Sequence, residues 1–245
     1  MSIDPLNIGL TGLEAYEAQI DVAANNIANV ATPGFQAQDV QFGDLVSGGV
    51  KARIAANAGP AAQPAPLEPT GVPTNLAVAG NGYFVLSSAN GPVYTLAGNF
   101  IIGGGGQLVD AATGDPVQST NGTPLAIPSG ATGVNFSPDG TVSATFANGS
   151  TQAVGRLALA TFANPSGLAR IGGGYVLSAN SGPAQIGAPA TASYGSIVAG
   201  ELTGSNVDLA ANIIALTEGQ KAFEANARSI VTGDELLGTI INDMK

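Results

Sequence analysis

Residues 209–244 read LAANIIALTEGQKAFEANARSIVTGDELLGTIINDM, and apolar side chains recur in this stretch at alternating spacings of three and four. The positions on this seam are Leu209, Ile213, Leu216, Gln220, Phe223, Ala227, Ile230, Asp234, Leu237, Ile241 and Met244. This spacing places them along one stripe of a helix, as in helices that pack lengthwise against another helix. The stretch predicts a helix of about 35 residues, or roughly 50 Å at 1.5 Å per residue. Ser205 and Asp208 resemble its capping box.

The N-terminal end repeats the same spacing. Its seam consists of Ile3, Leu6, Leu10, Leu13, Glu17, Ile20, Ala24 and Ile27. Asp4 and Pro5 suit the N-cap and first turn of a helix, and Thr32-Pro33-Gly34 suits the turn that ends it. We therefore predict two terminal helices that pair as a coiled coil, one within residues 1–32 and the other within residues 201–245.

Between these ends lies a long, nearly uncharged region. Residues 76–200 contain three acidic and two basic side chains, and Asn-Gly or Asp-Gly begins at positions 81, 90, 121, 139 and 148. Such dipeptides supply the positive φ angles of tight hairpins, and short alternating apolar runs separate them. We predict a central antiparallel β domain over 76–200, a small sandwich or barrel. Residues 33–75, with five Pro between 58 and 73, are predicted to be an extended linker or arm. The fold class is thus α+β.

The C-terminal helix has more apolar surface than one partner helix can cover. Val207, Ile214, Leu236 and Ile240 lie on rows beside the main seam. Such rows suggest further helices from other subunits. Gly219, Gly233 and Gly238 each weaken an isolated helix by about 1 kcal/mol relative to Ala, so the helix is expected to become firm on assembly.

The composition excludes several classes of function. The 245-residue chain has no His, no Cys and no Trp, which removes Ser-His triads, thiol chemistry and His or Cys metal sites. We expect no metal and no cofactor. The formal net charge of -10 disfavours nucleic-acid binding. The first 30 residues contain no Lys or Arg, so no secretory signal is predicted, and no apolar run is long enough for a membrane span.

Enzymatic activity is not expected. Aspartic proteases need Asp-Thr-Gly or Asp-Ser-Gly, whereas this chain has Thr113-Gly114-Asp115 and Asp139-Gly140-Thr141. Asp110 and Asp115 could in principle serve a glycosidase, but a glycan cleft usually offers aromatic platforms. We expect no small-molecule substrate.

An Asn-rich segment ends the first predicted helix. It reads Ala24-Asn25-Asn26-Ile27-Ala28-Asn29-Val30-Ala31-Thr32-Pro33-Gly34-Phe35. Asn is a mediocre helix former because its amide competes for backbone groups. Two interpretations stay open, a frayed helix end capped by Asn or a polar lattice that fixes the register of neighbouring helices. We favour a bridging role for Asn25 and Asn29, which lie one turn apart.

This segment also resembles the signature of the bacterial flagellar rod and hook family of axial proteins. Three further segments are similar to that family: 206–209 with 220–227, 76–84, and 94–100 with 107–109. Leu96 and Asn212 depart from the family pattern, which often has Arg and an acidic residue there. The chain length favours a rod component over a hook protein.

The resemblance implies a structural subunit of the flagellar basal-body rod, which self-assembles into a hollow helical tube for motility. The terminal helices would form the inner coiled-coil layer, with the β domain outside. The implied partners are copies of the chain, other rod and hook axial proteins, and the flagellar type III export apparatus. Export by that apparatus without a cleaved signal implies a periplasmic location in the basal body.

Two alternatives are a hook or hook-like axial protein and a surface adhesin with a coiled-coil stalk. An adhesin usually has a secretory signal and needs one helical terminus, so two helical ends favour the axial protein. The predicted assembly interface is Leu10, Leu13, Ile20, Asn25, Asn26, Ile27, Asn29, Pro33, Gly34, Phe35, Leu209, Ile213, Leu216, Gln220, Phe223, Asn226, Ile230, Leu237 and Ile241.

Overall fold

The computed structural model describes residues 5–44, 50–56, 65–172, 174–177, 181–191 and 193–243. Contacts divide the chain into two compact units. We call residues 1–30, 37–63 and 207–245 the helical unit, and residues 31–36 and 64–206 the β unit. The described part contains two long helices and antiparallel strands, which confirms the α+β class.

The helical unit contains α1 (Pro5–Ala28), α2 (Leu209–Asp243) and the strands β1 (Gln38–Asp44) and β2 (Val50–Ala56). Helix α2 has the predicted length, 35 residues. Its N-cap is Asp208, whose Oδ1 accepts a hydrogen bond from the N–H of Ala211 at 3.0 Å. The predicted capping box is therefore wrong in one respect, because Asp208 caps the helix and Ser205 precedes the cap by three residues.

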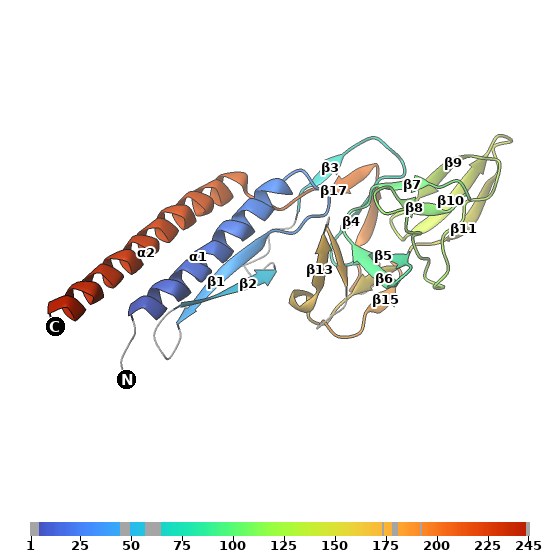
Figure 1. Cartoon of the computed structure of the whole chain (residues 1–245). Helices are drawn as coiled ribbons and strands as arrows, with labels where there is room; N and C mark the ends of the chain where they lie inside the picture. The colour runs from blue at the N-terminus through green and yellow to red at the C-terminus, as the bar shows by residue number, and fades with distance from the viewer. Residues whose placement is uncertain are drawn as a thin grey trace. The chain divides into compact units, whose positions relative to one another are not determined.

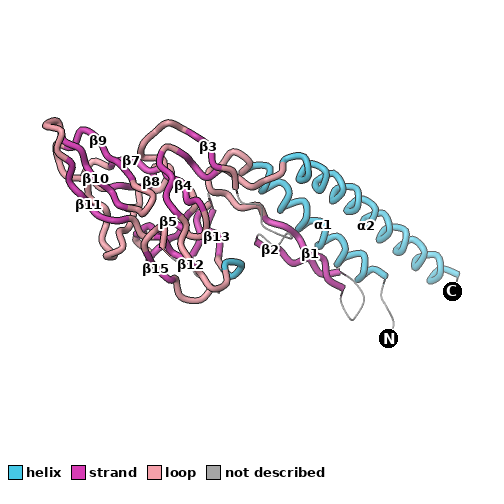
Figure 2. Tube along the Cα trace, turned by 180° about the vertical axis from the view of Figure 1, so that it is seen from behind, coloured by secondary structure: helices cyan, strands magenta, loops and turns pink. Residues whose placement is uncertain are grey.

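Strands β1 and β2 form an antiparallel hairpin within the residues predicted to be a linker. Val40 pairs with Ile54 and Phe42 with Ala52, so apolar side chains share one face of the hairpin. This face packs on α1, where the rings of Phe42 and Tyr16 are 5.6 Å apart. Figures 1 and 2 both show α1 between α2 and the hairpin. The expected linker over 33–75 is thus divided among residues 31–36 of the β unit, this hairpin and the short strand β3 (Leu67–Pro69).

The β unit holds the other strands, and every pair is antiparallel. A six-stranded sheet has the order β13-β14-β6-β5-β12-β15, and a three-stranded sheet the order β11-β10-β9. Three two-stranded sheets pair β16 with β4, β17 with β3 and β7 with β8. The strand bounds are β3 Leu67–Pro69, β4 Leu76–Ala79, β5 Tyr83–Ser88, β6 Gly91–Thr95, β7 Phe100–Ile102, β8 Leu108–Asp110, β9 Ala131–Phe136, β10 Thr141–Phe146, β11 Thr151–Arg156, β12 Leu159–Thr161, β13 Ala169–Gly172, β14 Tyr175–Leu177, β15 Gln185–Gly187, β16 Ser196–Ala199 and β17 Glu201–Thr203.

The core of the β unit lies on both faces of β5. Phe84, Val85 and Leu86 are all fully buried, although consecutive side chains of a strand point to opposite faces. Phe84 joins the larger apolar cluster and meets the ring of Phe100 edge to face at 5.0 Å. Val85 joins a second cluster, which also contains Tyr94 and Phe162. The short apolar runs that the sequence analysis found between the turns form strands, namely β4, β5, β6, β9, β10, β12 and β14.

Four of the five predicted Asn-Gly and Asp-Gly turns are confirmed, whereas Asn81-Gly82 forms a bend between β4 and β5, which belong to different sheets. The glycine of each of the five Asn-Gly and Asp-Gly dipeptides has a positive φ: Gly82, Gly91, Gly122, Gly140 and Gly149. Positive φ is accessible to Gly without the steric penalty of a Cβ, so these dipeptides fix where the chain reverses.

Asp110 organises a buried turn at the end of β8. Its Oδ2 accepts hydrogen bonds from the Tyr175 hydroxyl at 2.7 Å and from the N–H of Thr113 at 2.9 Å. Its Oδ1 is buried without a hydrogen-bond partner among the described residues. Burial, and then the hydrogen bond to Asp110, raise the pKa of Tyr175, so its hydroxyl remains a donor.

We expect Tyr175→Phe to lower the free energy of unfolding of the β unit by about 1–3 kcal/mol, because a buried carboxylate loses a donor. Urea titration monitored by circular dichroism measures this loss. The control is Tyr83→Phe, because no hydrogen bond from the Tyr83 hydroxyl is present among the described residues and its ring packs on Phe162. An equal loss in both variants would mean that the Asp110 contact contributes nothing.

Candidate assembly interface

Helices α1 and α2 pack antiparallel, and glycines lie at their contacts. A Cβ built on Gly9 would lie 2.6 Å from Cγ1 of Ile230, and one on Gly219 would lie 3.0 Å from Cγ1 of Ile20. A Cβ on Gly12 would lie 3.0 Å from Nδ2 of Asn226. These glycines therefore let the two helices approach closely. Gly219, which the sequence analysis treated only as a weak point of the helix, has this packing role.

Asn26 is the buried member of the Asn-rich segment, with 1% of its surface exposed. Its Nδ2 donates to Gln38 O at 2.8 Å and to Asn212 Oδ1 at 2.8 Å. Its Oδ1 accepts from the N–H of Gln38 at 2.9 Å. Nδ2 of Asn212 in turn donates to Asp208 O at 2.7 Å. Asn26 thus ties α1 to the start of β1 and to the first turn of α2.

The other two asparagines of the segment lie differently. Asn25 is exposed, and Nδ2 of Asn29 donates to the carbonyl oxygen of Asn25 at 2.9 Å. The sequence analysis expected Asn25 and Asn29 to bridge neighbouring helices. Within one chain, Asn26 makes the hydrogen bond between the two helices instead. A contact of Asn25 and Asn29 with neighbouring subunits stays a prediction.

The Pro33-Gly34-Phe35 segment lies inside the β unit. The N–H of Gly34 donates to Thr203 O at 2.7 Å, and Gly34 has a φ of +70°. The Phe35 side chain is buried beneath the guanidinium of Arg170, whose carbon is 5.6 Å from the ring centroid. Arg170 also donates to the carbonyl oxygen of Gln36. Two of these three predicted interface residues, Gly34 and Phe35, therefore have partners within their own β unit.

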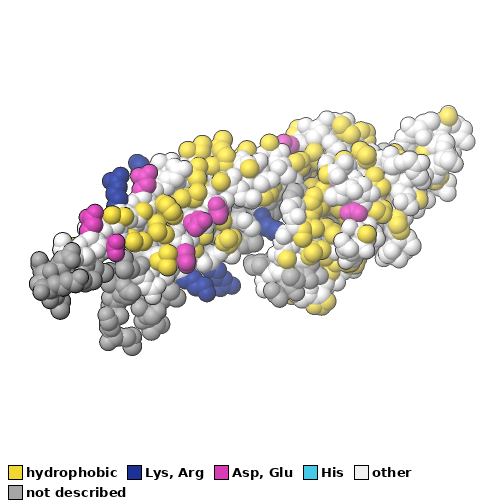
Figure 3. Space-filling model, in the orientation of Figure 1, with side chains coloured by type: hydrophobic (Ala, Val, Ile, Leu, Met, Phe, Trp, Pro, Cys, Tyr) yellow, Lys and Arg dark blue, Asp and Glu magenta, His cyan; other side chains and the backbone are white. Residues whose placement is uncertain are grey.

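Several predicted interface residues point outward from the helical unit. Leu10, Leu209 and Ile213 are exposed, with 51%, 43% and 49% of their surface accessible, and Gln220 is exposed as well. Ile214 and Leu236, which lie on the rows that the sequence analysis assigned to further helices, are exposed as well. Ile8 and Val231 are exposed apolar residues that the sequence analysis did not name. Figure 3 shows apolar side chains along the visible face of the helical unit. Exposed apolar rows of this kind are typical of helices that bind another protein surface.

The remaining predicted positions are partly covered within the chain. These half-buried residues are Leu13, Ile20, Ile27, Leu216, Phe223, Asn226 and Ile230. The side chains of Leu237 and Ile241 lie outside the described residues. The pairing of α1 with α2 accounts for contacts of Ile20, Asn226 and Ile230.

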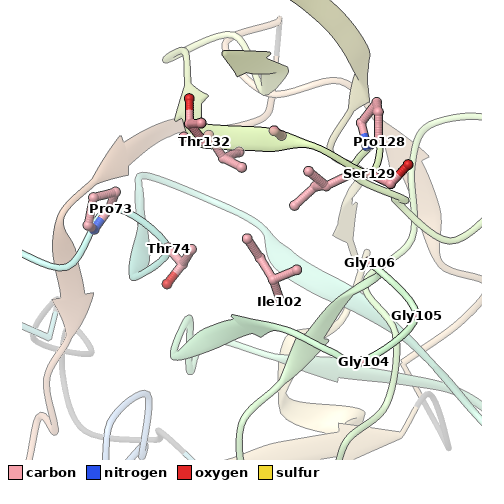
Figure 4. Close-up of a pocket in the computed structure, with 13 residues that line it drawn as sticks. Pro73, Thr74, Ile102, Gly104, Gly105, Gly106, Pro128, Ser129 and Thr132 are labelled. Atoms are coloured by element: carbon pink, nitrogen blue, oxygen red, sulfur yellow. The ribbon is translucent and has the colours of Figure 1, made fainter. Parts of the chain in front are cut away.

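The β unit contains a pocket with a volume of about 640 Å³ between the 104–106 turn and β9. Figure 4 shows Ile102, Pro73 and Thr132 around it, with the glycine turn at its rim. Its lining, as far as the structure describes it, has no ionisable side chain that could act as a general acid or base beside its Ser and Thr hydroxyls. Within the described residues there is no cluster of acidic side chains that could hold a metal ion and no helix that could span a membrane.

Three family models match successive parts of the chain. Residues 6–36 match the flagella basal body rod protein model, and residues 77–144 match the flagellar hook protein FlgE/F/G D1 domain. Residues 198–244 match the flagellar basal body rod FlgEFG protein C-terminal model. The matches thus include both helices and the first half of the β unit.

Full-length relatives decide between the members of this group. The flagellar basal-body rod protein FlgG of Bacillus subtilis is 35% identical, over 96% of this chain and 96% of that protein. The FlgG protein of Caulobacter vibrioides is 33% identical, over 95% of this chain and 96% of its own length. The chain belongs to the flagellar basal-body rod protein family.

The hook alternative has weaker support for this rod-family chain. The flagellar hook protein FlgE of Helicobacter pylori is 42% identical, but over 44% of this chain and 15% of the hook protein. The rod-family relatives match from end to end, so the chain is a structural subunit of the flagellar basal-body rod. A structural role agrees with the expectation that the chain is not an enzyme.

Proposed function

We propose that the chain assembles with copies of itself and with other axial proteins into a hollow helical tube. In this tube the helical units form an inner coiled-coil layer and the β units lie outside. The single observation that supports this proposal most is the exposed apolar surface of α2, which pairing with α1 leaves uncovered. Burying such surface stabilises an assembly by about 25 cal/mol per Å².

The proposal includes delivery of the chain by the flagellar type III export apparatus, without a cleaved signal, to a periplasmic position in the rod. The antiparallel pairing of α1 with α2 supports a coiled-coil layer in which each subunit contributes two helices. Phe223, half-buried in the middle of α2, is part of the proposed helix contacts.

The test is Ile214→Asp, which places a charge on a side chain that is 58% exposed in the single chain. We expect normal folding and no rod incorporation, because a carboxylate in a contact between helices has to be desolvated. Electron microscopy of basal bodies and a swimming assay measure the result. The control, Ile186→Asp, changes an exposed Ile of β15 outside the proposed layer. Normal rods with Ile214→Asp would contradict the proposal.

A further inference from the structure

The outward face of α1 carries an acidic stripe, which we define as Glu14, Glu17 and Asp21. Their spacings of three and four place them along one side of the helix, and all three are exposed. The same side is exposed at Leu10 and Asn25. Thus the stripe points away from the sides of α1 that pack on α2 and on the hairpin.

The hairpin carries a basic pair, which we define as Lys51 and Arg53 of β2. Alternate residues of a strand point to the same face, and both side chains are exposed. Arg53 pairs across the hairpin with Gln41 and Lys51 with Gly43, so these residues form the face opposite to Phe42. Since Phe42 packs on α1, the basic pair faces outward.

One chain does not pair these charges with each other. The ion pair that the structure shows within its described residues, Arg156 with Asp139, lies in the β unit. Neighbouring carboxylates on the stripe are spaced by about 5–6 Å, and the two cations by about 7 Å along the strand. The two patches therefore carry opposite charges at similar spacings.

We propose that the acidic stripe of one copy docks on the basic pair of a second copy of this chain. This inference rests on the proposed function, because it specifies one contact between subunits of the tube. The two patches are different surfaces, so the contact is heterologous and repeats from copy to copy along a polymer. Complementary charge sets partner orientation and register in such interfaces.

Charge reversal in cells that lack the native copy tests the contact. The acid variant carries Glu14→Lys and Glu17→Lys, and the base variant carries Lys51→Glu and Arg53→Glu. Either variant alone opposes like charges at every contact, so we expect rods per cell to fall at least about tenfold. Co-expression of both variants lets unlike copies alternate with complementary charges, and we expect rods to return to within about threefold of the unaltered chain.

The control is a double variant with Glu68→Lys and Glu201→Lys, which changes the net charge as the acid variant does but alters the β unit. We expect it to form normal rods. Normal rods from the acid or base variant alone would overturn the inference while the proposed function stands. Failure of co-expression to restore rods would also overturn it, because the patches would then meet within one chain or bind another partner. If the unaltered chain itself restored no rods, the proposed function would fail.

Discussion

Gly34→Ala is expected to lower the free energy of unfolding of the β unit by about 3–5 kcal/mol, among the largest effects of single substitutions. A Cβ on Gly34 would collide with the backbone N of Ala97 and lie 2.6 Å from the backbone carbon of Leu96. Neither neighbour is the movable end of a side chain, so the 31–36 segment has to shift. The shift breaks the hydrogen bond from Gly34 to Thr203. Urea titration of the purified chain measures the loss.

Gly71→Ala is the matched control. Gly71 has the same φ of +70°, but a Cβ there would meet nothing within 4 Å. This variant therefore has the backbone strain of positive φ alone, about 1–2 kcal/mol for a residue with a Cβ. An equal loss in the two variants would show that the contact between Gly34 and Ala97 is loose and that strain explains both.

Asn26→Asp is expected to destabilise the helical unit by about 3–5 kcal/mol at neutral pH, because the substitution buries a charge without a partner. It replaces the Nδ2 donor by an oxygen that faces two acceptors, Gln38 O and Asn212 Oδ1. The loss should diminish on acidification, since protonation removes the charge and restores one donor. In such a case the carboxyl pKa is raised in the folded state, so stability is lost as pH rises above about 4.

The neighbouring residue provides the control for this prediction. Asn25→Asp makes the same chemical change one position away, where the side chain is exposed. We expect a change within about 0.5 kcal/mol, as for other surface substitutions. Thermal unfolding at pH 7 and pH 4, monitored through helix ellipticity, distinguishes the two variants. A loss of stability at Asn26 that is no larger than at Asn25 would show that the hydrogen bonds of Asn26 do not stabilise the helical unit.

The elements that sequence analysis predicted are those whose pattern is local. The seam of α2 extends over many turns, and strands β4 to β6 are bounded by glycines that dictate positive φ. The hairpin β1–β2 was not predicted, because its apolar face packs on α1, a contact that a short window of sequence does not show. Strands β3 and β17 have three residues each and depend on their mutual pairing. Pairing over such a distance is not visible in a short window of sequence.

The residues of the candidate site were also predicted only where the sequence pattern is local. The apolar positions of the seam include exposed Leu10 and Ile213, since periodicity reports which side of a helix is apolar. It does not report which polar residue will be buried. The partners of Asn26 lie 12 and 186 residues away along the chain, so neighbouring sequence could not distinguish it from Asn25. Likewise, the burial of Phe35 depends on Arg170, far along the chain.

The way in which the β unit closes has a consequence for the order of folding. Strand β17 pairs with β3, and Nδ2 of Asn206 donates to Oε1 of Gln36, a residue 170 positions earlier. Contacts between such distant residues have a loop-closure entropy cost before they contribute stability, which slows folding. A chain that leaves a channel N-terminus first cannot complete its β unit until residue 206 has followed. Under the proposed export, the β unit therefore gains these long-range contacts only after nearly the whole chain has left the channel.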